Sequence, residues 1–494
     1  MLIQIRDSPE KKGLNHMIKL NRAELKDKIY ACWLGKNIGG TLGTPYEGQQ
    51  KVHDIKGYNS PPGNPLPNDD LDLQIIWLRA MREVGPQNLN ARILGEYWME
   101  YITPFWNEYG ICKANMAHGL SAPMSGEYNN SWKHSNGAWI RTEVWACLYP
   151  ANVEKAIYFA YQDACVDHGM GEGTYAAIFV AALESAAFVV SDIRELIKIG
   201  LSKIPSTCRF HKAITMVCDA YDSGKTWLEA RELVTNASLE DKELGWFQAP
   251  ANVAYAIIGL LYGEGDFKQS LIISVNCGDD TDCSAATAGS ILGIIGGTKV
   301  IPEDWKQYIG DSIVTVAINR GNLWGWLPAT CTDLSNTIIE THAITMFREN
   351  VCVTDGESEV PEDEVAKFKG STFADSIGSR SPYHIEYNFT TVKAIVEFNR
   401  APDMKPNDEI EAKITLKYNL SAQKQFNLRW ILPEGWTVEG PSTVNTTVYR
   451  WSTPTSVTCK IKSGELVSSK NRGVLEITTD ARAEVGLIPL IFFS

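Results

Sequence analysis

The sequence lacks an excess of positive charge. Its 494 residues include 46 Lys and Arg against 59 Asp and Glu, which gives a net charge of −13. Binding to the phosphate backbone of a nucleic acid requires clustered cations that displace counterions. We therefore expect no nucleic acid as a direct partner.

The sequence also lacks paired cysteines and a long apolar run. Its 11 cysteines are scattered without a CxxC pair, which disfavours a zinc knuckle or a disulfide framework and favours a reducing, cytoplasmic location. The N-terminus, MLIQIRDSPEKKGLNHMIKL, has no apolar core followed by a cleavage site, so it does not resemble a signal peptide. The most apolar stretch, 174–190, contains Glu184 and is shorter than the roughly 20 residues of a membrane-spanning helix. We expect a buried core helix there and no membrane partner.

The chain changes its periodicity after its first two thirds. Apolar residues first recur three to four positions apart, which predicts helices, whereas segments such as AIVEFN and EIEAKITLKY alternate with a period of two, which predicts strands. Between them lies the acidic run TDGESEVPEDEVAKFKGS. The expected organisation is a poorly ordered tail (1–21), a compact all-α domain (22–350), a linker (351–380) and a smaller all-β sandwich (381–494).

Two acidic clusters each precede a predicted helix. The segment NDDLD places Asp69, Asp70 and Asp72 after a loop rich in Pro, Gly and Asn, and GDDTD at 278–282 repeats the theme. Favourable placement at a helix N-terminus explains one or two of these carboxylates. Three so close together repel one another unless a cation compensates them. A site for two hard cations such as Mg²⁺ or Mn²⁺ is the alternative, because these ions prefer oxygen ligands.

Six segments occur in the same order as in the ADP-ribosylglycohydrolase family. They are GKNIGGTLGTPYEG (35–48), NDDLD (68–72), SNGAWIR (135–141), DACVDHG (163–169), GDDTDC with the small-residue helix AATAGSILG, and VIPEDW. The chain resembles this family over residues 25–305. The resemblance implies a mainly α protein, with an all-α ADP-ribosylglycohydrolase-like domain that holds two Mg²⁺ or Mn²⁺ ions between its paired aspartate motifs.

The resemblance also implies roles for the residues at matching positions. The implied metal ligands are Asn68, Asp69, Asp70, Asp280 and Asp282. The implied catalytic residues are Glu47, Asp70 and Asp280, with Glu47 acting on the attacking water. The residues implied to lie near the substrate are Asn136, Gly137 and His168.

Two positions depart from the family pattern. Asn68 and Cys283 stand where the family often has threonine. An amide oxygen is still a suitable ligand for a hard cation, but a thiol is a poor one for Mg²⁺. Cys283 therefore leaves a coordination position to water or shifts the preferred metal.

The expected function is that of a metal-dependent glycoside hydrolase acting on N- or O-ribosyl bonds, with a small-molecule or ADP-ribosylated substrate. Its metal ions would hold the ribose diol and activate water. Two alternatives stay open: hydrolysis of another ribofuranosyl or nucleoside-like glycoside, and binding of a nucleotide or sugar without turnover. Six tryptophans either stack on a base or sugar or pack in the core, namely Trp98, Trp106, Trp132, Trp139, Trp324 and Trp326.

Overall fold

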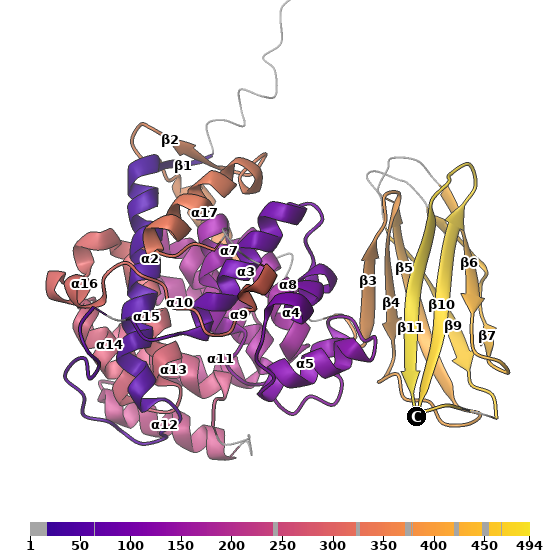
Figure 1. Ribbon diagram of the computed structural model, residues 1–494, viewed down its shortest axis with the longest axis horizontal. Helices are drawn as coiled ribbons and strands as arrows, with labels where there is room; N and C mark the ends of the chain where they lie inside the picture. The colour runs from indigo at the N-terminus through magenta and orange to yellow at the C-terminus, as the bar shows by residue number, and fades with distance from the viewer. Residues whose placement is uncertain are drawn as a thin grey trace, which may run out of the picture.

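The computed structural model describes a helical body followed by a β region that lies beside it (Figure 1). The described residues are 17–63, 65–240, 246–322, 327–370, 377, 379–418, 424–446, 454–465 and 467–494. This arrangement confirms the predicted fold class of a mainly α chain that ends in an all-β unit.

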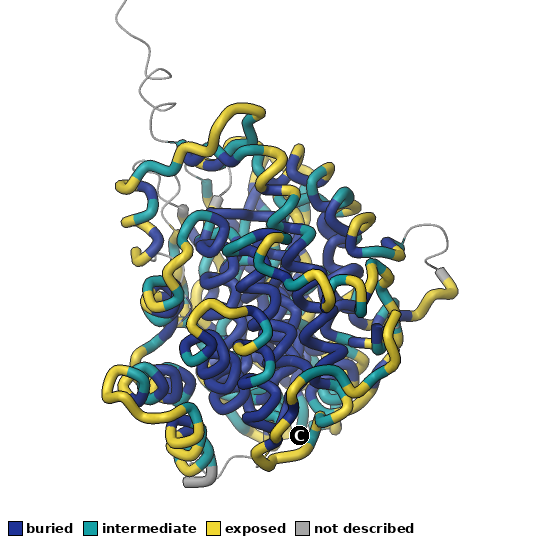
Figure 2. The backbone as a smooth tube through the Cα atoms, turned by 90° about the vertical axis from the view of Figure 1, so that its left-hand side faces the viewer, coloured by how far each residue is buried: buried dark blue, intermediate teal, exposed yellow. Residues whose placement is uncertain are grey.

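Within the described residues, the helical domain contains α18 (Glu362–Ala366), whose Val365 packs against the core of the domain, and sixteen α-helices that precede it. Their bounds are α2 (Arg22–Gly43), α3 (Asp69–Val84), α4 (Ala91–Tyr101), α5 (Asn107–Ala117), α6 (Met124–Glu127), α7 (Glu143–Leu148), α8 (Val153–His168), α9 (Glu172–Ala187), α10 (Ile193–Leu201), α11 (Arg209–Asp222), α12 (Trp227–Glu240), α13 (Ala249–Tyr262), α14 (Phe267–Asn276), α15 (Thr281–Gly296), α16 (Glu303–Ile309) and α17 (Cys331–Thr345). Helices α9, α13 and α15 are buried over most of their length. Figure 2 shows the buried residues gathered in the middle of this domain.

The apolar stretch singled out in the sequence forms α9, one of the buried core helices. No single helix in the described residues combines the length and apolar composition of a membrane span. Thr281–Val300 and Glu303–Ile309 reach that length and composition only together, across a bend of 112°.

Glycines bring α2 and α15 into backbone contact. A Cβ atom at Gly35 would lie 2.2 Å from the carbonyl oxygen of Gly289, and one at Gly39 would lie 2.2 Å from that of Ala285. A Cβ atom at Gly43 would lie 2.3 Å from the backbone nitrogen of Asp282. Only glycine permits this approach. The end of α2 and the start of α15 therefore meet, and with them the first and last motifs of the domain.

The β region consists of two antiparallel sheets. Its strands are β3 (His384–Asn388), β4 (Val392–Phe398), β5 (Glu409–Tyr418), β6 (Lys424–Ile431), β7 (Thr437–Glu439), β8 (Thr443–Thr446), β9 (Thr455–Lys462), β10 (Lys470–Thr479) and β11 (Val485–Phe493). One sheet has the order β11-β10-β6-β8 and the other β3-β4-β5-β9-β7. Alternate side chains of both sheets share one core, in which the rings of Phe398 and Phe492 lie 5.6 Å apart. The two sheets therefore form a sandwich.

Two segments expected as tail and linker belong to the helical domain instead. Strand β1 (Ile18–Asn21) pairs in parallel with β2 (Val351–Thr354), with Ile18 opposite Val351. Both of these side chains are buried in the core of the helical domain. The structure thus corrects the prediction at these residues, because backbone pairing and the burial of Ile18, Leu20 and Val351 fix both segments. Residues 1–16 lie outside the described part, and the other boundaries stay predictions.

The β region docks on the segment that follows α5. Leu120 and Met124 pack into the core of the sandwich. The Tyr128 hydroxyl donates a hydrogen bond to Asp403 at 2.5 Å. Helix α5 therefore reaches the β region with its C-terminal end.

Candidate functional site

A cavity of about 80 Å³ collects most of the acidic residues singled out in the sequence. Its lining consists of Glu47, Asp69, Asp70, Trp106, Asn107, Glu108, Tyr109, Ser135, Asn136, Gly137, Ile140, Phe247, Asp280, Asp282 and Cys283. Within the described residues, no lysine, arginine or histidine is part of this lining. The wall is therefore acidic and aromatic.

Local folding places each acidic residue at a helix end. Helix α2 runs into a short 3-10 turn (Thr44–Tyr46), and Glu47 follows it directly. Asn68 caps α3, because its Oδ1 accepts a hydrogen bond of 2.8 Å from the backbone N–H of Asp70. Asp282 lies in the first turn of α15. The glycine contact between α2 and α15 then brings these termini together.

Two overlapping sets of ligand atoms lie in the cavity. Atoms of Asp70, Asp282 and Cys283 all lie within 4.8 Å of one another, and so do atoms of Glu47, Asp280 and Asp282. Asp70 Oδ2, Asp280 Oδ1 and Asp282 Oδ1 are buried and receive no hydrogen bond from the described residues. Buried carboxylate oxygens without hydrogen bonds are costly unless cations compensate their charge. These residues fit two adjacent cations that share Asp282.

Burial and mutual repulsion raise the pKa values of this cluster. Burial raises the pKa of Asp69 to about 6, with a further contribution from the charge of Asp282. The charge of Asp282 is also the main cause that raises the pKa of Glu47 to about 8. Burial raises the pKa values of Asp70 and Asp280 well above their usual range. A bound cation would reverse these shifts, because it stabilises the ionised form.

A buried lysine pairs with one aspartate of the cluster. Lys36 Nζ lies 3.7 Å from Asp70 Oδ2 and 2.8 Å from Glu143 Oε1. Gln74 donates a hydrogen bond of 2.8 Å to the other oxygen of Glu143. Although burial opposes it, the charges of Glu143 and Asp70 raise the pKa of Lys36. Lys36 therefore stays charged and holds Asp70 in place.

The turn before α15 is held by Asn252. Its Nδ2 donates to Asp279 Oδ2 at 2.9 Å, and its Oδ1 accepts from the backbone N–H of Asp280 at 3.0 Å. Asp279 also accepts from the backbone N–H of Phe247 at 3.1 Å. Asp279 therefore orients the turn and Phe247, while Asp280 faces the cavity.

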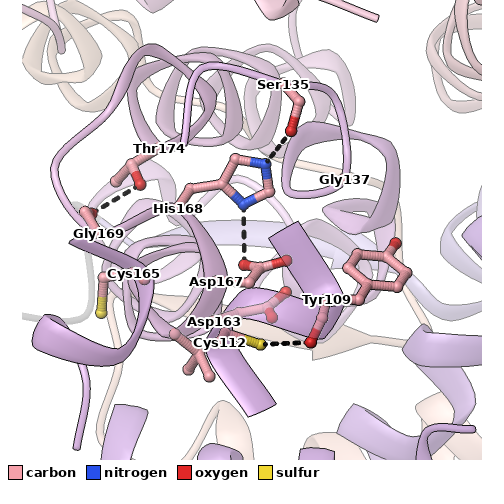
Figure 3. A network of polar contacts seen from close by, with 12 residues as sticks. Tyr109, Cys112, Ser135, Gly137, Asp163, Cys165, Asp167, His168, Gly169 and Thr174 are labelled. Atoms are coloured by element: carbon pink, nitrogen blue, oxygen red, sulfur yellow. Dashed lines mark hydrogen bonds and ion pairs between the residues drawn. The ribbon is translucent and has the colours of Figure 1, made fainter. Parts of the chain in front are cut away.

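The residues predicted near the substrate divide into two groups. Asn136 and Gly137 line the cavity, and Asn136 Nδ2 donates to Asp280 Oδ2 at 2.6 Å. His168 is fully buried behind the wall, with its Nε2 3.2 Å from Ser135 Oγ and its Nδ1 2.9 Å from Asp167 Oδ1 (Figure 3). His168 thus contacts a lining residue and does not itself line the cavity.

The last residue of the SNGAWIR motif, Arg141, forms buried ion pairs. The buried Arg141 pairs with Asp163 at 3.0 Å and with Asp167 at 2.8 Å. Burial acts to raise the pKa of Asp167, but the charges of Arg141 and His168 outweigh it and lower that pKa. This network ties α8 to the segment that carries Asn136 and Gly137.

A comparison with known proteins identifies the helical domain. The sequence model of the ADP-ribosylglycohydrolase family matches residues 21–338. The chain belongs to this family. Membership supports a metal-dependent glycohydrolase, as the sequence predicts. A search of curated protein sequences finds no match.

Solved structures are similar to parts of the chain. The "ADP-ribosylglycohydrolase-related protein complex" is 18% identical over 66% of this chain and 100% of that chain, with a TM-score of 0.46. The FixG-related protein from Vibrio parahaemolyticus is 10% identical over 22% of this chain and 98% of that chain, with a TM-score of 0.19. The GAE domain of GGA2p from Saccharomyces cerevisiae is 12% identical over 23% and 97%, with a TM-score of 0.15.

Most ligand positions implied by the ADP-ribosylglycohydrolase resemblance come together. Asp69, Asp70, Asp280 and Asp282 line the cavity with Glu47. Asn68 is absent from the lining, and its oxygen already caps α3.

Several lining residues of this cavity were not predicted from the sequence. Glu108 and Tyr109 lie two and three positions after Trp106 at the start of α5, and Trp106 is 52% exposed. The adjacent aromatic and acidic residues of the segment FWNEYG are the signal that was available.

The other tryptophans divide between core and surface. Trp98 and Trp139 are buried in the core, and Trp132 is half-buried. Trp324 and Trp326 lie outside the described residues.

Proposed function

We propose that this protein is a metal-dependent hydrolase that cleaves the ribosyl glycosidic bond of an ADP-ribosyl conjugate, with two Mg²⁺ or Mn²⁺ ions bound. The observation that carries this proposal is the pair of ligand sets that share Asp282. A carboxylate common to two adjacent positions is typical of dinuclear hydrolytic sites. Asp70 and Asp282 would hold one ion, and Glu47, Asp280 and Asp282 would contact the other.

The protein side chains would position the reactants. When bound, the two ions would supply Lewis-acid chemistry and orient the ribose hydroxyls. Glu47, at the exposed edge of the cavity, would accept a proton from the attacking water. Asn136 fixes the orientation of Asp280 through their 2.6 Å hydrogen bond. Lys36 fixes the orientation of Asp70 through their ion pair at 3.7 Å.

Cys283 would be a neighbour of the metal site and not a ligand. Its Sγ lies 3.6 Å from Asp70 Oδ1 as a hydrogen-bond donor. Burial raises the pKa of this thiol well above its usual range. A thiol that keeps its proton is a poor ligand for a hard cation. Water would then complete the coordination sphere, and Mg²⁺ and Mn²⁺ would both be accepted.

A second candidate function follows from the charge of the wall. The described lining has six carboxylates and no cationic side chain. A diphosphate would find no ion-pair partner there. This observation favours hydrolysis of a simple ribofuranosyl glycoside as the alternative.

The test compares substrates and metals directly. Release of ADP-ribose or ribose from ADP-ribosyl-arginine, ADP-ribosyl-serine and simple ribosides would be followed by NMR with Mg²⁺, Mn²⁺ or EDTA. The variant Asp282→Asn should abolish turnover and Mn²⁺ binding. Asp266→Asn is the matched control, because Asp266 caps α14 away from the cavity and asparagine caps equally well.

Each outcome selects one function. Metal-dependent release from an ADP-ribosyl substrate supports the proposal, and release from simple ribosides alone supports the second candidate. Metal binding without turnover of any glycoside indicates a binding protein. Full turnover by Asp282→Asn contradicts the shared-ligand assignment.

A further inference from the structure

Glu108 is a carboxyl group of the cavity that neither acidic motif contains. It lies in the first turn of α5 and lines the same cavity as the aspartates. Its side chain is 5% exposed, and its Oε2 has no hydrogen-bond partner among the described residues. A buried carboxyl with one oxygen that makes no hydrogen bond, at the wall of a cavity lined by acids, is a candidate for proton transfer.

The wall opposite Glu108 leaves room for its carboxyl group. A Cβ atom at Gly137 would lie 2.3 Å from Glu108 Oε1, so any larger residue at this position would displace the carboxyl from where it lies. The motif SNGAWIR therefore provides space for the Glu108 carboxyl at Gly137 and a hydrogen bond from Asn136 to Asp280.

Several charged and polar groups face Glu108. Burial is the largest influence and raises its pKa, while His168 on α8 lowers it. Asp167 on the same helix raises the pKa, and the Ser135 hydroxyl lowers it. Asp69 on α3 lies so close to Glu108 that the charge of Glu108 contributes to raising the pKa of Asp69. The net effect raises the pKa of Glu108 and favours the protonated form.

Cleavage of a glycoside with a basic leaving group requires a proton at the departing atom. Carboxylates that bind metal ions stay ionised and have no proton to give. Glu47 is assigned to the attacking water. Asp69 and Glu108 are the two lining carboxyls outside both ligand sets. Asp69 is among the metal ligands that the family resemblance implies, so Glu108 is the lining carboxyl that is left without a role.

We propose that Glu108 is the general acid that protonates the leaving group. This role rests on the proposed glycosidase function. The bond between the anomeric carbon and the leaving atom breaks, its electron pair stays on the leaving atom, and the Glu108 proton moves to that atom. Water adds to the anomeric carbon and gives a proton to Glu47. Exchange with solvent then restores both glutamates.

Substrates with different leaving groups test this role. The test uses the metal-loaded protein with benzyl and 4-nitrophenyl D-ribofuranosides, each as the anomer that the wild type cleaves. Benzyl alcohol needs a proton to depart, whereas 4-nitrophenolate departs as the anion. Glu108→Gln should lower kcat/KM for the benzyl riboside by about 10²–10⁴-fold and for the nitrophenyl riboside by less than about 10-fold.

A matched control separates this role from a loss of structure. Glu364 is also a buried glutamate in the first turn of a helix, α18 (Glu362–Ala366), and it does not line the cavity. Glu364→Gln should leave both rates unchanged. Thermal unfolding of both variants shows whether the fold is retained.

Wild-type pH profiles give a second measurement if Glu108→Gln does not fold. The benzyl riboside should show an alkaline decline in kcat/KM that the nitrophenyl riboside lacks. Equal losses for both substrates in a folded Glu108→Gln variant overturn the role of Glu108 but not the proposed function. The same alkaline decline for both substrates in the wild type has the same meaning. Absence of wild-type turnover with every glycoside overturns the proposed function and this role with it.

Discussion

The contact between α2 and α15 predicts a large effect for a single methyl group. In Gly39→Ala the new Cβ would lie 2.2 Å from the Ala285 carbonyl oxygen, about 1.2 Å short of the 3.4 Å at which ordinary contact begins. The neighbouring atoms, Ala285 C and Ala286 N, belong to the backbone, so no side chain can rotate away. The helices must therefore separate.

Two effects of this substitution oppose each other. Overpacking of a core costs about 1–3 kcal/mol, and a collision with backbone on both sides lies at the upper end. Alanine in a helix interior is about 1 kcal/mol more favourable than glycine. The overpacking effect is larger, so a net loss of about 2 kcal/mol in the free energy of unfolding remains. The family match alone spans residues 21–338, and for a domain of this size the melting temperature changes by about 1–2 °C per kcal/mol. The melting temperature should therefore fall by about 2–4 °C.

Calorimetry of the metal-free protein measures this effect, and titration with Mn²⁺ measures its consequence for the site. Glu47 follows α2 and Asp282 begins α15, so separation of the helices should also weaken Mn²⁺ binding. Gly57→Ala is the control, because nothing lies within 4 Å of a Cβ at Gly57. If Gly39→Ala melts and binds Mn²⁺ as Gly57→Ala does, the backbone contact is wrong.

Three further effects are expected. Burial raises the pKa values of Asp69 and Asp72 to about 6 and 7 in the folded state. The folded protein therefore holds protons that the unfolded chain releases, and stability in EDTA should fall as the pH rises from about 4 to 7. A melting temperature that rises over this range contradicts it. Lys36→Met leaves Glu143 buried without its cation and should cost about 3–5 kcal/mol in urea unfolding; a loss below about 1 kcal/mol would show that the pair is not buried. Tyr128→Phe removes one hydrogen bond to the β region and should cost about 1 kcal/mol, measured by calorimetry; a larger loss would mean that the tyrosine ring also moves.

The motifs of the sequence predicted the centre of the site better than its walls. The NDDLD and GDDTD segments each carry several carboxylates at a helix start, so their convergence could be inferred from local pattern. Glu108 is a single acid in an aromatic segment, and only tertiary packing brings it to the cavity. Lys36 resembles a surface residue in sequence, and its burial depends on Glu143, 107 positions away.

The strands β1 and β2 could not be inferred for a related reason. Each is four residues long, too short to establish a period of two. Their pairing joins residues more than 300 positions apart. The sandwich was predictable because its longer strands alternate clearly, as the burial pattern of β4 shows.

The reciprocity of the glycine contact limits how this family member can diverge. A Cβ at Gly35 meets the Gly289 carbonyl at 2.2 Å, and a Cβ at Gly289 meets the Gly35 carbonyl at 2.3 Å. Because each side chain would collide with backbone, no compensating change at the partner position can relieve either substitution. Gly35 and Gly289 are therefore both restricted to glycine, and substitutions at the two positions cannot be correlated. Methods that infer contacts from correlated substitutions would overlook this pair of glycines, although it lies between the helices that bring the acidic residues together.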